Sequence, residues 1–209
     1  MSVLPLYEYP HPILAQKAER VLKVDDSVRK LLDDMLETMY ADKGVGLAAP
    51  QIGVSKRIIV IDTEQRDEDG NYKPGNPMYL VNPEIIYKSE ETIFFCEGCL
   101  SVPKQNADVE RHYKIKVRYL DYNGKEQEIE AEDYPAVVLQ HEIDHLDGIL
   151  YIDRISRLKR NMLLKKLENC SRRRSCGTYR SALCPQGRKK RSRYRKGHLW
   201  RSDYPLAES

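Results

Sequence analysis

The chain of 209 residues has no apolar stretch close to the roughly 18 residues that a membrane-spanning helix needs. Its start, MSVLPLYEYPHPILAQ, lacks the basic segment and the long apolar run of a secretory signal. Five cysteines are present, but their spacing is irregular, which together with the missing signal favours reduced thiols over a disulfide framework. We therefore expect a cytoplasmic protein that does not associate with membranes.

Acidic residues are scarce near the C-terminal end of the chain. Residues 170–209 hold twelve Lys and Arg but only two Asp and Glu, a net charge of +10, whereas residues 1–169 carry −7. The basic runs CSRRRSCGTYRS and GRKKRSRYRKGH have few apolar residues and no sustained periodicity, which is typical of disorder. We therefore expect one folded domain over residues 1–169 and a basic, largely disordered tail over residues 170–209.

Strands are predicted where β-branched and aromatic residues gather between turn residues. The clearest hairpin signal is a pair of alternating runs on either side of Asn123-Gly124, a dipeptide favoured in tight turns. Pro83 is expected to introduce a bulge or to mark an edge strand. The predicted strands and the hairpin cover residues 56–63, 78–89, 92–102 and 114–132.

Helical spacing of apolar residues predicts three helices. The first lies within residues 24–44, with Asp26 or Ser27 as its N-cap. The other two cover residues from about 135 to 155 and residues 156–169, and the last is amphipathic and basic. Strands followed by a buried helix, together with antiparallel hairpins, predict an α+β fold.

Histidine is also rare, yet two of the five histidines fall in one motif, His141-Glu142-x-x-His145. Residues four apart on a helix project from the same face, so both imidazoles can bind one metal ion. Glu142 lies between them and can act as general base toward a metal-bound water. The apolar residues around the motif indicate a buried helix, and buried imidazoles need strong partners such as a metal.

A third protein ligand could come from either side of this motif. A zinc metalloprotease would take it from downstream, where Asp147, Asp153 and Glu168 are available but form no protease pattern. Upstream, Cys99 offers a soft thiolate suited to iron(II) or zinc, although a buried structural thiol is the alternative. Cys96 is close to it, but strand alternation places these two cysteines on opposite faces.

A glycine-rich segment, GVGLAAPQIGVS at residues 44–55, is predicted to be an irregular turn. It loosely fits a dinucleotide-binding loop, but it follows a helix and precedes a strand, the reverse of what such a site requires. Gly44 and Gly46 would let the backbone approach a ligand closely. Gln51 at the end of the segment is a neutral donor that could bind an oxyanion.

The segments GVGLAAPQ, EGCLS and QHEIDH, in this order, resemble the three signature motifs of bacterial peptide deformylase. The resemblance covers roughly residues 3–168 and stops at the basic tail. It implies an α+β fold in which antiparallel sheets surround the helix that carries the metal site. It also implies an enzyme that removes the N-formyl group from the first methionine of nascent proteins and releases formate.

By motif position, the resemblance implies that Cys99, His141 and His145 bind iron(II), with zinc, nickel or cobalt able to replace it. Glu142 would be the general base and acid. The remaining catalytic residues implied are Gln51 and the Leu100 N–H, which would bind the oxyanion, and Gly46. The residues expected to bind substrate are Gly44, Val45, Phe95, Glu97, Tyr134, Val137 and Val138. Ordinary core packing is the alternative for the aromatic and valine side chains among them.

The basic tail supports a separate hypothesis, a nucleic-acid-binding function. Tyr179, Tyr194 and Trp200 are interleaved with basic residues that could hold RNA phosphates while the rings stack on bases. A solvated tail without a function is the alternative. Since a deformylase acts on chains that emerge from the ribosome, we expect the ribosome as a partner, reached through the basic C-terminal helix and tail.

Overall fold

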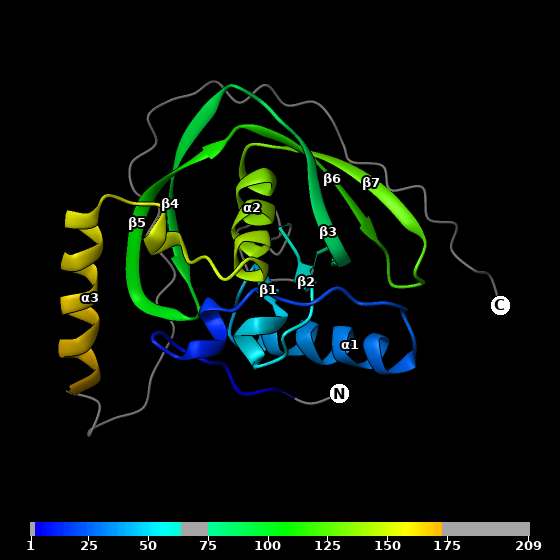
Figure 1. Ribbon diagram of the computed structural model, residues 1–209, viewed down its shortest axis with the longest axis horizontal. Coiled ribbons are helices and arrows are strands. Elements are labelled where there is room, and N and C mark those ends of the chain that lie inside the picture. Colours follow the sequence, from blue (N-terminus) through cyan, green and yellow to red (C-terminus); the bar gives the residue numbers. More distant parts are fainter. Residues whose placement is uncertain (1–2, 64–74, 173–209) are drawn as a thin grey trace.

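The structure is a computed structural model that describes residues 3–63 and 75–172. Two antiparallel sheets surround the helix α2 (Tyr134–Leu146), which stands between them in Figure 1. This confirms the predicted α+β fold with a central helix. Of the predicted tail, residues 173–209 lie outside the described part of the chain.

The larger sheet has five strands in the order β1-β2-β3-β6-β7, and β4 and β5 form the smaller sheet. Every neighbouring pair in both sheets is antiparallel. The strands are β1 (Gly46–Ala48), β2 (Ile58–Ile61), β3 (Met78–Lys88), β4 (Thr92–Cys99), β5 (Val102–His112), β6 (Lys114–Leu120) and β7 (Glu126–Glu132). The β6–β7 hairpin lies where Asn123-Gly124 predicted it, with a loop at residues 121–125 in which the Gly124 N–H donates to the Asp121 carbonyl. A register shift between Val81 and Glu84 confirms the expected bulge at Pro83.

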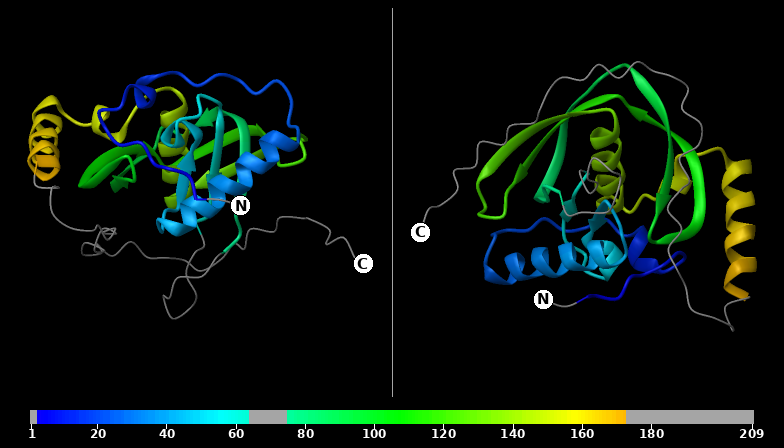
Figure 2. Two further views of the ribbon diagram at one scale, coloured as in Figure 1. Left: turned by 90° about the horizontal axis from the view of Figure 1, so that it is seen from below. Right: turned by 180° about the vertical axis from the view of Figure 1, so that it is seen from behind.

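The helix α1 (Asp26–Ala41) covers the face of the five-stranded sheet opposite α2. Alternate residues of β2 explain this arrangement: Ile59 packs in the cluster with α2, whereas Ile58 packs in the cluster with α1. Both faces of this strand are therefore buried, which accounts for its uninterrupted apolar run. In Figure 2, α1 crosses in front of the sheet when the molecule is seen from below and lies under it when seen from behind.

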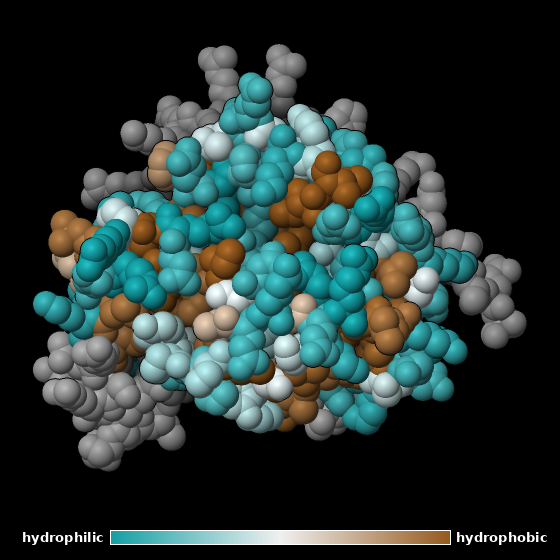
Figure 3. Space-filling view, viewed as in Figure 1, coloured by the Kyte–Doolittle hydropathy of each residue, from teal (hydrophilic) through white to brown (hydrophobic). Residues whose placement is uncertain are grey.

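The third helix, α3 (Arg157–Arg172), packs on the outer side of the smaller sheet. Leu163, Leu164 and Leu167 join a cluster with Val109 of β5 and Tyr151. Within residues 3–63 and 75–172, none of the helices has the length and apolar content needed to cross a bilayer. Figure 3 shows hydrophilic residues over most of one face, with smaller hydrophobic patches between them.

Three details differ from the sequence predictions. The N-cap of α1 is Asp25 rather than Asp26 or Ser27, because its carboxylate accepts the Val28 N–H at 3.0 Å. The helix α2 ends at Leu146, because the chain turns at Gly148, which has a φ of +72° and no room for a side chain beside the Ala15 backbone. The predicted irregular turn at 44–55 contains β1 and the 3₁₀ helix η2 (Ala49–Ile52).

Candidate metal centre

Two segments distant in the sequence, the end of β4 and the C-terminal half of α2, bring three side chains together. The ligand atoms of Cys99, His141 and His145 all lie within 4.8 Å of one another. Cys99 Sγ is 3.2 Å from His145 Nε2. In the described part of the chain, this is the one group of three or more His, Cys, Asp or Glu side chains arranged to hold a metal ion. The downstream candidates Asp147 and Asp153 do not belong to it, and the side chain of Glu168 is not described.

The end of β4 directs the thiol toward the helix. The register of the β4–β5 pair shifts between Gly98 and Cys99, so that Cys99 lies opposite Val102 across a tight turn. Such a shift bends the strand and re-aims the side chains beside it. Cys96, on the other face of β4, is exposed, which confirms the alternation expected from the sequence.

The three side chains fit a transition-metal ion. Two imidazoles and one thiolate form a mixed donor set that suits zinc and iron(II). His141 Nδ1 is 2.7 Å from Glu97 Oε2, which leaves Nε2 of this ring for a metal. The Nδ1 atom of His145 is buried and has no hydrogen-bond partner among the described residues.

The electrostatics of the two histidines differ. Burial alone would lower the pKa of His141, but hydrogen bonds with Cys99 and Glu97 raise it well above its usual value. Burial lowers the pKa of His145 far below its usual value, and the charges of His141 and Arg111 add to this effect. His145 is therefore held in the neutral form that a metal requires.

Glu142 lies beside the three donors and is almost completely enclosed, at 4% exposure. Burial raises its pKa to about 7. One of its carboxylate oxygens, Oε2, is buried without a hydrogen-bond partner among the described residues. Gly46 packs directly against this carboxylate, since a Cβ on Gly46 would lie 2.8 Å from Glu142 Cδ and closer still to Oε1. A carboxylate in this setting can exchange a proton near neutral pH.

Gln51 is held with its amide nitrogen toward the thiol. Its Oε1 accepts the Ala48 N–H at 2.8 Å, so the side chain cannot rotate without losing this hydrogen bond. Its Nε2 donates to Ser101 Oγ at 3.2 Å and lies 3.6 Å from Cys99 Sγ. The sequence prediction of a neutral donor close to the metal ligands agrees with this placement.

Glu97 was expected to bind substrate, and the structure shows the contacts that its carboxylate makes within the protein. It is buried at 4% exposure, and its carboxylate accepts hydrogen bonds from Arg111 Nε at 2.6 Å and Nη2 at 2.9 Å. Burial alone would raise the pKa of Glu97, but Arg111 and His141 lower it to about 2. Glu97 therefore lies behind His141 as an anionic partner of its ring, and its carboxylate is hydrogen-bonded to both Arg111 and His141.

The other residues expected to bind substrate lie at the start of β1, in a pair of aromatic rings and in the core. Gly44 and Val45 lead into β1, the edge strand of the larger sheet. Phe95 and Tyr134 are half-buried, with ring centroids 5.3 Å apart. Val138 packs in the core cluster between α2 and the five-stranded sheet, which favours the alternative of ordinary core packing for this residue.

Four residues around the centre were missed by sequence reasoning. Tyr151 stacks on His141 with ring centroids 6.2 Å apart and donates from its hydroxyl to the Gln105 carbonyl. The other three are ionic residues behind His141, namely Arg111, Asp144 and Arg154. Of these four residues, only Asp144 could have been placed near the centre from the sequence, because it follows His141 by three residues and therefore lies near it on the helix.

Comparison with known proteins agrees with this geometry. The family model described as polypeptide deformylase matches residues 3–161. Peptide deformylases of Rickettsia canadensis and Rickettsia akari are 51% and 52% identical over 168 residues, covering 80% of this chain and 96% of each relative. The crystal structure of the Ehrlichia chaffeensis peptide deformylase in complex with actinonin has a TM-score of 0.76 at 45% identity, covering 82% of this chain and 99% of that one. The chain therefore belongs to the polypeptide deformylase family.

Proposed function

We propose that Cys99, His141 and His145 hold the metal with which this enzyme carries out the reaction of its family. That reaction is the metal-dependent removal of the formyl group from the N-terminal methionine of newly synthesised proteins, with release of formate. The observation that carries the proposal is the convergence of the three donor atoms within 4.8 Å beside the buried carboxylate of Glu142.

The chemistry of the centre follows from its donors. A divalent ion held there would lower the pKa of a bound water toward ~7 and polarise the formyl carbonyl. The water oxygen attacks the formyl carbon, and Glu142 accepts the proton that this water loses. Glu142 then returns this proton to the leaving nitrogen, so that the C–N bond breaks and formate and a free amine result.

The negative charge that develops on the formyl oxygen needs preorganised donors. Gln51 Nε2 and the N–H of Leu100 serve as these donors in the proposal. The Gln51 amide is already oriented by its hydrogen bond to the Ala48 N–H. Loss of one such donor typically costs ~10²–10³ in rate.

The proposed metal is iron(II), with zinc, nickel or cobalt able to replace it. The support is the donor set, because one thiolate and two imidazoles bind these ions in preference to magnesium or calcium.

The proposed location of the enzyme is the cytoplasm, where nascent formylated chains are made.

The substrate is proposed to bind as an extended peptide along β1. Among the described residues this strand has β2 as its one neighbour, so that its other edge can accept the backbone of a peptide near Gly44, Val45 and Gly46. Phe95, Tyr134 and Val137 are the proposed contacts of the methionine side chain. Comparing a formyl-methionyl peptide with its norleucine and alanine analogues tests this pocket, and equal KM values for all three would contradict it.

An internal peptide bond is the alternative substrate for a helix with this histidine spacing. A formylated tripeptide, the same tripeptide without the formyl group, and a longer peptide blocked at both ends distinguish the two activities. We expect formate from the first peptide and no cleavage of the other two. Cleavage of the blocked peptide with no formate from the first would identify an endopeptidase instead.

Replacement of Gly46 by alanine is expected to lower formate release by about 10²-fold, because a displacement of about 1 Å at a catalytic group has an effect of this size. The added methyl group would force the Glu142 carboxylate to move. Metal content and thermal stability serve as controls and are expected to change little. Activity equal to that of the unchanged protein would show that Glu142 is not confined as proposed.

The ribosome is proposed as a partner through α3 and the basic tail. The basic residues Arg157, Lys159, Lys165 and Lys166 are exposed on α3, while Leu163, Leu164 and Leu167 pack against the domain. The charge of the tail adds to this electrostatic attraction for RNA phosphates. A chain ending at Asn169 should sediment with ribosomes less than the full chain at moderate salt, and equal sedimentation of the two would remove the basis for a role of the tail.

A further inference from the structure

A continuous series of buried ionic residues runs from the surface to the back of His141. Arg111 binds Glu97 through Nε and Nη2, and its Nη1 donates to Asp144 Oδ2 at 2.6 Å. Asp144 also accepts hydrogen bonds from Nε and Nη2 of Arg154. The series therefore proceeds from Arg154 through Asp144, Arg111 and Glu97 to the Nδ1 atom of His141.

Only the outer end of this series is open to solvent. The side chain of Arg154 is 40% exposed, whereas those of Asp144, Arg111 and Glu97 are 9%, 2% and 3% exposed. A cavity of about 380 Å³ is lined in part by Arg111, Asp144 and Arg154, and none of Glu142, Cys99, His141 and His145 lines it. Arg154 can therefore be replaced without opening the core or touching a metal donor.

The two arginines share one carboxylate. Asp144 accepts from Arg154 with both oxygens and from Arg111 with one of them, so that its negative charge is divided between two cations. If Arg154 is removed, this buried carboxylate depends on Arg111 alone. The guanidinium of Arg111 is then drawn toward Asp144 and away from Glu97, which holds the ring of His141.

We infer that Arg154 is a positioning residue that, through Asp144 and Arg111, keeps Glu97 in place against His141 and so orients this metal ligand. The inference rests on the proposed function, because it takes His141 as a metal ligand. Residues that orient a metal-binding histidine typically contribute 10–100-fold to metal affinity or activity, about the range in which we expect Arg154 to act.

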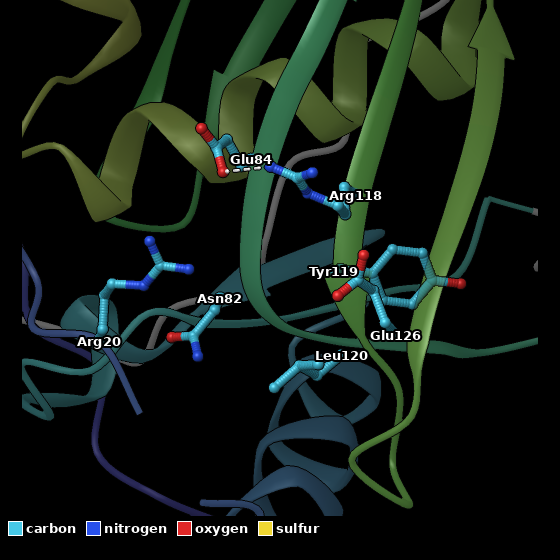
Figure 4. A pocket seen from close by; sticks show the side chains of 7 residues that line it. All are labelled: Arg20, Asn82, Glu84, Arg118, Tyr119, Leu120 and Glu126. Atoms are coloured by element: carbon cyan, nitrogen blue, oxygen red, sulfur yellow. Dashed lines mark hydrogen bonds and ion pairs between the residues drawn. The ribbon is translucent and has the colours of Figure 1, made fainter. Parts of the chain in front are cut away.

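Arg118 provides a matched control variant. Its side chain is 45% exposed, close to the value for Arg154, and it pairs with Glu84 at 3.3 Å. Figure 4 shows this pair beside Arg20 and Asn82 at a separate pocket of about 90 Å³. No residue of the buried ionic series lines this pocket. Both variants remove one half-exposed arginine, but only Arg154 is linked to His141 through the buried ionic series.

The test is the affinity of the protein for cobalt(II) and zinc, measured by competition with a chelator, together with the visible spectrum of the cobalt form. For Arg154→Ala we expect about tenfold weaker binding and an altered cobalt spectrum, with a normal fold by circular dichroism. Arg154→Lys keeps the charge but not the two-pronged contact, so we expect an intermediate affinity. Arg118→Ala should match the unchanged protein in both measurements.

The outcomes separate this inference from the proposed function. Unchanged affinity and an unchanged cobalt spectrum in Arg154→Ala would overturn the inference while leaving the metal centre intact. An equal loss of metal affinity in Arg118→Ala would also overturn the inference, because removal of any half-exposed arginine would then weaken metal binding. Failure of the unchanged protein to bind cobalt or zinc would instead overturn the metal centre on which the inference rests.

Discussion

Replacement of Glu142 by glutamine is expected to lower formate release by ~10²–10⁴-fold, the usual contribution of a general acid–base group. Glutamine has nearly the same shape as glutamate, so the packing against Gly46 should be retained. It cannot accept the proton of the attacking water, and among the described residues the group of donors, Cys99, His141 and His145, contains no carboxylate that could replace it. The measurement is the initial rate of formate production from a formyl-methionyl peptide, with metal content determined on the same sample.

The matched control for this variant is Glu84→Gln, at a glutamate that pairs with Arg118 away from the centre. Its rate of formate release should equal that of the unchanged protein. The assigned role of Glu142 would be contradicted by a Glu142→Gln variant that retains full activity with a full complement of metal. A loss of activity accompanied by loss of metal would place Glu142 in metal binding instead.

Replacement of Cys99 by alanine is expected to remove the metal and, with it, the formate-releasing activity. Since loss of a residue that only orients a ligand costs ~10–100-fold in affinity, loss of the ligand itself should lower metal affinity by more than about 10²-fold. Cys96 offers a close control, because it is three residues away on the same strand but exposed on the opposite face. Cys96→Ala should therefore bind metal normally.

The same pair of variants also distinguishes the two possible sources of the third ligand. If Cys99→Ala kept its metal, a residue outside the group of three donors would have to complete the site. That result would favour the downstream ligand of a metalloprotease over the upstream thiolate. Because Cys99 Sγ lies 3.2 Å from His145 Nε2, we expect Cys99→Ala to lose its metal.

Much of the fold could be predicted because its signals are local. The spacing of His141 and His145 places both rings on one face of a helix whatever surrounds them. Asn123-Gly124 between two alternating runs was sufficient to locate the β6–β7 hairpin. The uninterrupted apolar run of β2 indicated a buried strand, and the structure places helices against both of its faces.

The strand β5 could not be predicted in the same way. Its inward-facing positions include Gln105 and Arg111, at 9% and 3% exposure, so the alternation of apolar and polar residues is interrupted. These polar side chains are buried because Arg111 meets Glu97 and Asp144. Tertiary partners rather than local hydrophobicity therefore determine this strand.

The contacts of Glu97 could not be predicted for a related reason. Its partner Arg111 is 14 residues away, and Asp144 is a further 33 residues from Arg111. Ion pairs over such separations depend on the register of β4 with β5 and on the docking of α2, neither of which a local pattern reveals. The motif EGCLS located Glu97 near the centre, but its position behind His141 became apparent only from the packing.

The central claim is that a metal held by Cys99, His141 and His145 is required for deformylation. The most direct test is formate release from a formyl-methionyl peptide by the anaerobically purified protein, with its metal content measured before and after chelation. We predict about one ion per chain, loss of formate release when the ion is removed, and recovery when iron(II) is returned. Formate release that continues at full rate in the metal-free protein would contradict the claim.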